Sequence, residues 1–189
     1  ALAAPAIGWT GESGGGVVAA KTWFTSDTHF HHARVIEYCR RPWRTVDEMN
    51  EGLISNWNAV VAPEDTVYFL GDFAFANAKR ADALRQQLNG RVRFLRGNHD
   101  SRAAQLLFAF ENSLLPGDTY TEGDVHCTLV HEPHRSVDAA VRHPIVLHGH
   151  VHELWAHNRI GDRLYLNVGV DVRNYRPVSL AELLASVLP

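Results

Sequence analysis

The sequence predicts an α/β protein in which a parallel sheet is followed by a second or mixed sheet. Two patterns lead to this prediction: short apolar strands alternate with amphipathic helices in the first half of the 189 residues, and the second half contains mainly strands. Alternation of this kind is typical of parallel strands that crossover helices connect. The composition, 46% hydrophobic and 21% charged residues, is that of a globular protein with a sizeable core.

Each element of the first half has a local signal. Three short runs rich in β-branched, aromatic and aliphatic residues are predicted to be strands: 22–26, 66–70 and 91–95. Segment 46–60 repeats apolar residues at helical spacing, and Thr45 with Glu48 has the form of a capping box at its start. Shorter helices are predicted over residues 33–39, 78–88 and 102–110.

The second half is predicted to contain mainly strands. Segments 118–123 and 125–130 have the pattern of two strands that pair around a turn. Two further strands are predicted over residues 144–147 and 163–168. Ser179 and Glu182 form another capping box, which opens a final helix that ends near Val187. These later strands account for the second or mixed sheet.

Charge, cysteine content and hydropathy exclude several classes of protein. The formal net charge of −3 provides no basic field, so no strong nucleic-acid-binding patch is predicted. Cys39 and Cys127 form neither a C-x-x-C motif nor a disulfide framework, which favours reduced thiols in the cytoplasm. No apolar run reaches the roughly 18 residues of a membrane span. We expect residues 1–20 to form a flexible tail before a single domain over residues 21–189.

Polar clusters follow the predicted strands. They are Asp27-x-His29, Gly71-Asp72, Gly97-Asn98-His99-Asp100, His131 and Gly149-His150-x-His152. In open α/β sheets, ligands bind beyond the carboxyl ends of the strands. An aspartate and a histidine at positions i and i+2 point the same way if the chain stays extended, as a shared metal ion would require. Taken alone, that pair also fits an ordinary polar loop.

In this order, the five clusters resemble the calcineurin-like metallophosphoesterase superfamily, whose pattern is D-x-H, G-D, G-N-H-[DE], a later His and G-H-x-H. The stretches RPW, NEGLISNWN, DTVYFLGDFAF and NVGVDVRNYRPVSL further resemble a small bacterial and phage branch of predicted phosphoesterases. The resemblance implies a four-layer α/β/β/α sandwich with two mixed β-sheets. His31 departs from the branch, which has glycine at this position; it would either narrow the pocket or point into solvent.

Carried over residue by residue, the resemblance implies two metal sites that share one carboxylate. One ion would be held by Asp27, His29, Asp72 and His152, and the other by Asp72, Asn98, His131 and His150. We prefer His131 to its neighbours His126 and His134 because it stands at the carboxyl end of its strand. Mixed carboxylate, amide and imidazole ligands suit divalent Mn, Fe, Zn, Co or Ni, of which we favour Mn. Two such ions about 3.5–4 Å apart activate water and stabilise the attacking and leaving oxygens.

The resemblance also implies residues that act on the substrate. His99 would lie over the substrate phosphate, and Asp100 would orient or polarise it. Three residues near the metal loops are predicted to contact the substrate, with surface or structural roles as the alternative: His32, Arg41 and Arg102. Arginine suits phosphate because it can make bidentate contacts.

The implied reaction is the hydrolysis of a phosphate ester. The chain is short for a large capping domain, and an open site accommodates groups on both sides of a phosphate, so we favour a phosphodiesterase acting on a nucleotide-type substrate. A phosphomonoesterase or nuclease is the alternative enzyme. The alternative of another class is a metal-containing binding module without catalysis. The physiological substrate, the native metal and the oligomeric state stay open.

Overall fold

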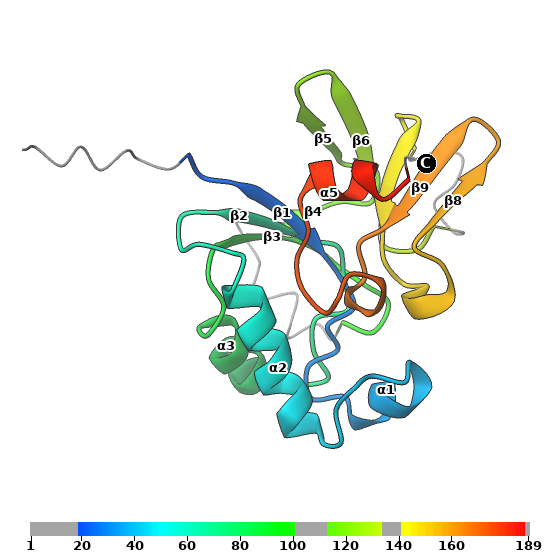
Figure 1. Ribbon diagram of the computed structural model, residues 1–189. Coiled ribbons are helices and arrows are strands. Elements are labelled where there is room, and N and C mark those ends of the chain that lie inside the picture. Colours follow the sequence, from blue (N-terminus) through cyan, green and yellow to red (C-terminus); the bar gives the residue numbers. More distant parts are fainter. Residues whose placement is uncertain (1–18, 101–112, 134–140, 188–189) are drawn as a thin grey trace, which may run out of the picture.

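Two β-sheets share one apolar core in the computed structural model, and helices flank them (Figure 1). The structure describes residues 19–100, 113–133 and 141–187. The predicted tail over residues 1–20, apart from its last two residues, and the predicted helix over residues 102–110 lie outside these ranges. The other predicted helices and strands are present, with shifts of a few residues at their ends. Among the described helices, none combines the length and apolar character that a membrane span requires.

The first sheet has the strand order β1-β2-β3-β4, and each neighbouring pair is parallel. The strands are β1 (Thr22–Thr25), β2 (Thr66–Phe69), β3 (Arg91–Leu95) and β4 (Ser113–Leu114). Parallel neighbours need crossover connections, and the helices in the described parts of these connections are α1 (Ala33–Tyr38), α2 (Val46–Asn58) and α3 (Ala78–Arg85). An antiparallel bridge also joins Phe24 of β1 to Val178.

The second sheet is mixed and has the strand order β5-β6-β7-β9-β8. Its strands are β5 (Thr119–Glu122), β6 (Val125–Leu129), β7 (Ile145–His148), β8 (His157–Ile160) and β9 (Arg163–Asn167). Strands β6, β7 and β9 are parallel, whereas β5 and β8 pair antiparallel at the edges. The sequence does not predict β4 or β8, because β4 has two residues and all of β8 is exposed.

Helices α2 and α3 cover one face of the first sheet (Figure 1), and their apolar residues are buried with those of the strands. Thr45 caps α2 with the predicted hydrogen bond. The opposite face of the sheet packs against the second sheet. Helix α5 (Leu180–Ala185) adds Leu180 and Leu183 to the core between the sheets, and it begins with the capping box predicted at Ser179.

The carboxyl ends of the parallel strands lead into the polar clusters. Asp27 follows β1, Asp72 follows β2, and His131 follows β6. Two short 3₁₀-helices lie at these ends as well, η1 (His152–Leu154) after β7 and η2 (Val170–Val172) after β9. Hydrogen bonds and a bridge join the strand ends of the two sheets. The fold therefore gathers clusters from distant parts of the sequence at one edge.

Candidate metal centre

Three loops of the first sheet are tied together where their strands end. The amide of Asp27 donates a hydrogen bond to the carbonyl oxygen of Gly71 (2.9 Å). The carboxylate of Asp100 accepts hydrogen bonds from the amides of Asp72 (2.8 Å) and Gly97 (2.7 Å). The loops after β1, β2 and β3 therefore form one unit in which each polar cluster has a defined place.

The predicted metal ligands have unusual backbone conformations. Nine non-glycine residues in the described ranges have positive φ, and five of them are predicted ligands: Asp27 (58°), His29 (49°), Asp72 (61°), His150 (75°) and His152 (47°). Left-handed backbone at such residues costs on the order of 1–3 kcal/mol and is enforced by the surrounding structure, often at functional sites. The chain does not stay extended through the D-x-H motif: Asp27 and His29 are both left-handed, and their ligand atoms still lie together.

The side chains of the predicted ligands lie in two groups. Ligand atoms lie within 4.8 Å of one another in the group Asp27, His29 and His152 and in the group Asp72, His131 and His150. The amide oxygen of Asn98 belongs to the second group, because it is 2.9 Å from Nε2 of His131 and 2.9 Å from Nδ1 of His150. Asp72 connects the groups: its Oδ2 is 3.5 Å from Nε2 of His29 and 3.3 Å from Nε2 of His131.

Two buried atoms at the centre have no hydrogen-bond partner among the described residues: Nε2 of His29 and Oδ2 of Asp72. The two side chains are 3% and 1% exposed, so bulk water does not solvate these atoms. An unsatisfied buried polar atom costs about 1–3 kcal/mol, and a bound ion is one of the few explanations for it. A divalent cation accepts both an imidazole nitrogen and a carboxylate oxygen as ligands. The donor set therefore fits a metal centre.

Burial and neighbouring charges perturb the titration of this centre. Burial opposes charge on His29 and lowers its pKa to about 3, so the ring is neutral and keeps a free lone pair at pH 7. Burial also opposes charge on Asp72, but the nearby ring of His131, 3.3 Å away, outweighs this and lowers the pKa of Asp72 to about 2. Against burial, the nearby carboxylate of Asp72 raises the pKa of His131 to about 9. Metal binding therefore has to displace a proton from His131.

Gly71 and Gly97 let the loops approach Asp72 and His131 closely. Gly71 has a φ of 101°, a conformation that favours glycine, and a Cβ there would lie 2.5 Å from Nδ1 of His131. A Cβ on Gly97 would overlap Oδ1 of Asp72. The ring of His131 is held by a hydrogen bond between Nδ1 and the carbonyl oxygen of Leu70 (2.7 Å), with Nε2 on the side of Asp72. The glycines of the G-D and G-N-H-D blocks thus have a steric role.

Arg41 is buried behind the centre. Its guanidinium forms a bidentate pair with Asp171 (2.8 and 3.0 Å) and donates to the carbonyl oxygens of Asp27 (2.7 Å) and Thr28 (2.8 Å). Asp171 in turn pairs with Nδ1 of His152 (2.8 Å). Arg41 is 4% exposed, and a buried guanidinium with its donors engaged does not reach a substrate. The predicted substrate contact of Arg41 is therefore replaced by a structural role.

Asp171 orients the ring of His152. With Nδ1 of His152 bonded to this carboxylate, the other ring nitrogen stays available to a metal ion. Burial opposes charge on His152, but the bond with Asp171 raises its pKa to about 11, so a metal ion also has to displace a proton from this ring. Cys39, His152 and Asp171 also place ligand atoms within 4.8 Å of one another. Because Arg41 engages both oxygens of Asp171, we assign no metal ion to this third group.

His99 lies at the rim of the centre. It is exposed, and its ring centroid is 5.6 Å from that of His29. Its amide donates to Oδ1 of Asp72 (2.8 Å), which ties its backbone to the second ligand group. Asp100 is 3% exposed and accepts hydrogen bonds from three backbone amides. None of these bonds involves the ring of His99, so within the described residues Asp100 holds the loops instead of orienting His99 as predicted.

His32 lies beside the centre and stacks on an exposed ring. Its ring centroid is 5.4 Å from that of His29 and 4.4 Å from that of Phe75, and the planes of His32 and Phe75 are 18° apart. Contact between His32 and the substrate stays a prediction, which this position supports. The remaining predicted contact, Arg102, lies outside the described residues.

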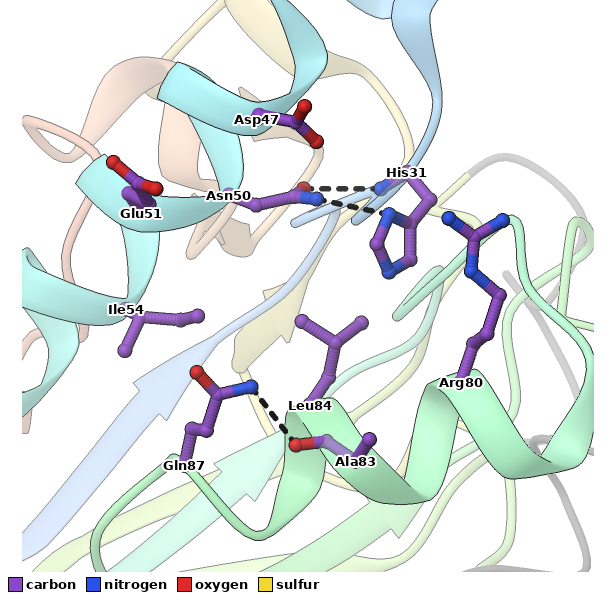
Figure 2. A pocket seen from close by; sticks show the side chains of 9 residues that line it. All are labelled: His31, Asp47, Asn50, Glu51, Ile54, Arg80, Ala83, Leu84 and Gln87. Atoms are coloured by element: carbon purple, nitrogen blue, oxygen red, sulfur yellow. Dashed lines mark hydrogen bonds between the residues drawn. The ribbon is translucent and has the colours of Figure 1, made fainter.

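A cavity of about 330 Å³ lies between α2 and α3 (Figure 2), and none of the residues that line it is a predicted ligand. His31 lines this cavity, where Asn50 holds it. Oδ1 of Asn50 accepts from the amide of His31 (3.1 Å), and Nδ2 of Asn50 is 2.9 Å from Nδ1 of His31. His31 has a φ of 63°, a conformation that explains why glycine suits this position in the resembled branch. The histidine therefore faces a groove between helices.

Two residues beside the centre are not predicted from the sequence: Asp171 and Phe75. Asp171 comes soon after β9, so the rule that polar clusters follow strand ends could have found it. Phe75 has no such signal, because an aromatic residue after a buried strand usually belongs to the core.

Three similar proteins extend over most of this chain. The uncharacterized protein MJ1445 of Methanocaldococcus jannaschii is 40% identical over 169 residues, which cover 85% of this chain and 87% of that protein. Gene 66 protein of Mycobacterium phage L5 is 32% identical over 186 residues, which cover 80% of this chain and 87% of that protein. The crystal structure of a protein of unknown function from Aquifex aeolicus has a TM-score of 0.67 and 26% identity, and the match covers 89% of this chain and 100% of that one. The names of these proteins state no activity.

The family model for the calcineurin-like phosphoesterase superfamily domain matches residues 21–179. The matched range begins just before β1 and ends at the cap of α5, so it includes both sheets and both ligand groups. The match and the fold agree with the order of polar clusters in the sequence. The chain therefore belongs to the calcineurin-like phosphoesterase superfamily and is a metal-dependent phosphoesterase.

Proposed function

We propose that this chain is a dinuclear phosphodiesterase that acts on a nucleotide-type substrate. The proposal rests on one observation: the two ligand groups lie next to each other, and the carboxylate of Asp72 faces both. Two cations that share a ligand can act on the attacking and the leaving oxygen of the same phosphate. Binding two ions in this way requires all seven ligand side chains, and all seven are present in the sequence.

Each ion would have four protein ligands. Asp27, His29, Asp72 and His152 would hold one, and Asp72, Asn98, His131 and His150 would hold the other. This mixture of carboxylate, amide and imidazole suits borderline divalent metals, among which Mn is favoured over Fe, Zn, Co and Ni. When bound, the two ions withdraw charge from the phosphoryl oxygens and activate water near neutral pH.

The chain itself positions the substrate and supplies a proton. In the hydrolysis, a water oxygen bonds to phosphorus while the bond from phosphorus to the leaving oxygen breaks, so the leaving oxygen gains negative charge. His99 stands beside the first ligand group, with its ring 5.6 Å from that of His29, and can give a proton to that oxygen. Asp100 and the amide of His99 keep the loop that carries the imidazole against Asp72.

The openness of the site favours a diester. Asn98 and His99 are exposed, and His150 is half-buried, so among the described residues both substituents of a phosphodiester have room beside the ligands. A nucleotide-type diester supplies two such substituents. A phosphomonoester would use the same ligands and remains the alternative substrate.

A panel of esters tests the proposal. It contains bis(4-nitrophenyl) phosphate, thymidine 5′-(4-nitrophenyl phosphate), 4-nitrophenyl phosphate and a single-stranded oligonucleotide, and bound metal is measured on the same samples by mass spectrometry. We expect two ions per chain and a higher kcat/KM for the diesters than for the monoester. A preference for the monoester would identify a phosphomonoesterase, and rapid cleavage of the oligonucleotide a nuclease. Bound metal without turnover of any ester would indicate a binding module.

We also propose that the protein works in the cytoplasm. Cys39 and Cys127 are both buried and free, and reduced thiols are typical of that compartment. Fractionation of cells that express the chain tests this, and recovery in another compartment would contradict it.

A further inference from the structure

An aromatic side chain that the proposed reaction does not use stands at the rim of the centre. Phe75 is 53% exposed, whereas Phe73, two residues earlier in the same loop, is 1% exposed. Single exposed apolar residues are common on protein surfaces and need no explanation. Phe75 differs from such residues because its neighbours are the histidines of the candidate site.

Backbone hydrogen bonds hold the loop that carries this ring. The amide of Phe75 donates to the carbonyl oxygen of Phe30 (2.8 Å), and the amide of Phe30 donates to the carbonyl oxygen of Phe73 (2.9 Å). Phe30 and Ala74 form a parallel bridge, so the loops after β1 and β2 are paired at this point. A loop that is already held in place loses little conformational freedom when a ligand binds to it, which favours binding.

Phe75 continues a row of rings that leads to the ligands. The centroid of Phe75 is 4.4 Å from that of His32, and the two planes are 18° apart. The centroid of His32 is 5.4 Å from that of the ligand His29, and the centroid of His99 is 6.2 Å from that of Phe75. His32 stacks on the Phe75 ring, and the exposed 53% of Phe75 offers aromatic surface to a further planar group. Offset stacks of this kind are favourable for aromatic rings.

We propose that Phe75 and His32 form a stacking platform for a nucleobase of the substrate, whose phosphate lies at the ligand groups. This inference rests on the proposed nucleotide phosphodiesterase function and specifies which part of the substrate the chain recognises. In a nucleotide one sugar separates the base from the phosphate, and the ring centroid of Phe75 lies 6.2 Å from that of His99, the residue assigned to the phosphate. Every base has a π-face, so the platform selects nucleotides over alkyl esters without preferring one base.

Two diesters with the same leaving group distinguish binding of the base from hydrolysis at the phosphate. They are thymidine 5′-(4-nitrophenyl phosphate) and methyl 4-nitrophenyl phosphate. With Phe75→Ala and saturating Mn²⁺, we expect KM for the thymidine ester to rise about tenfold or more, because stacking supports base binding to this extent. KM for the methyl ester, and kcat for both esters, should change little. Phe75→Trp should keep the lower KM for the thymidine ester, because tryptophan also has an aromatic ring. Phe75→Leu should lose it, because leucine keeps the apolar volume but has no ring.

Tyr38→Ala is the matched control, since Tyr38 is an exposed aromatic residue (64%) at the end of α1. It should alter neither KM. Equal changes in KM for both esters in Phe75→Ala, or no change in either, would overturn the platform and leave the phosphodiesterase proposal intact. Circular dichroism confirms that each variant is folded.

A binding experiment tests the platform independently of turnover. Calorimetry measures the Kd of thymidine 5′-monophosphate and of inorganic phosphate for the Mn²⁺-loaded wild type and for Phe75→Ala. A nucleotide Kd that is about tenfold weaker in the variant, with an unchanged phosphate Kd, supports the platform even if the wild type cleaves no diester. Equal nucleotide Kd values for the two proteins would overturn it.

Discussion

Replacing Asp171 with asparagine is expected to weaken metal binding at His152 without removing a ligand. The carboxylate of Asp171 joins Arg41 to Nδ1 of His152 through three contacts of 2.8, 3.0 and 2.8 Å. Asparagine keeps the size of the side chain, but it has no charge, and one of its two terminal atoms is a donor. The guanidinium of Arg41 would then stay buried without its counter-charge, and the ring of His152 would lose its anionic partner.

The magnitude follows from the burial of this pair. The side chains of Arg41 and Asp171 are 0% and 1% exposed, and removing one partner of a buried pair costs about 3–5 kcal/mol. Because asparagine fills the same space and still accepts one hydrogen bond, we expect the lower end, a loss of about 3 kcal/mol in the free energy of unfolding. Removing the carboxylate behind a metal-binding histidine typically weakens metal affinity about 10–100-fold.

Both quantities can be measured on metal-free protein. Calorimetric titration with Mn²⁺ gives the affinities, and urea unfolding gives the stability. Asp65→Asn is the matched control, because Asp65 is a buried carboxylate (3% exposed) that accepts three hydrogen bonds at the amino-terminal end of the first sheet. Asp65→Asn should lose stability and keep the wild-type Mn²⁺ affinity. Asp171→Asn should lose both, with the loss of affinity confined to one of two sites.

The reasoning is refuted if Asp171→Asn binds Mn²⁺ as tightly as the wild type. It is refuted equally if Asp65→Asn loses as much affinity as Asp171→Asn, because the effect would then come from general destabilisation. In either case Asp171 would serve only to hold Arg41.

Three further outcomes are expected. Because Asp72 faces both ligand groups, Asp72→Asn should lose both ions and all turnover, whereas His131→Ala should mainly weaken one site; one tightly bound ion per active wild-type chain, measured by mass spectrometry, would contradict this. His99→Ala should keep both ions and lose roughly 10²–10⁴-fold in kcat/KM on alkyl esters but far less on nitrophenyl esters, which need no proton; equal losses would exclude proton donation. Burial opposes the charge of Asp65, but its hydrogen bonds lower its pKa below 3.8 on balance, so its stabilisation is complete above that pH and is lost on acidification through the lowered pKa. The difference in stability between the wild type and Asp65→Asn, measured by urea unfolding, should therefore shrink as the pH falls through the lowered pKa, and a constant difference would contradict it.

The order of strands and helices and the candidate ligands could be predicted from short stretches of sequence. Asp27, Asp72 and His131 each follow an apolar run, and parallel strands bring such positions to one edge of the molecule. The cap at Thr45 and the capping box at Ser179 are likewise local, because they depend on residues within one helical turn. Signals of this kind need no knowledge of what lies across the fold.

The roles of Arg41 and Asp100 could not be predicted in this way. An arginine near a metal loop suits phosphate, but Arg41 meets Asp171, which is 130 residues away in the sequence. The carboxylate of Asp100 likewise meets amides of a loop 28 residues earlier, which leaves it bonded to backbone instead of to His99. Whether a charged side chain is buried, and which groups pair with it, depends on segments that only folding brings into contact. The exposure of Phe75 has the same origin, since nothing in its neighbouring residues distinguishes it from the buried Phe73.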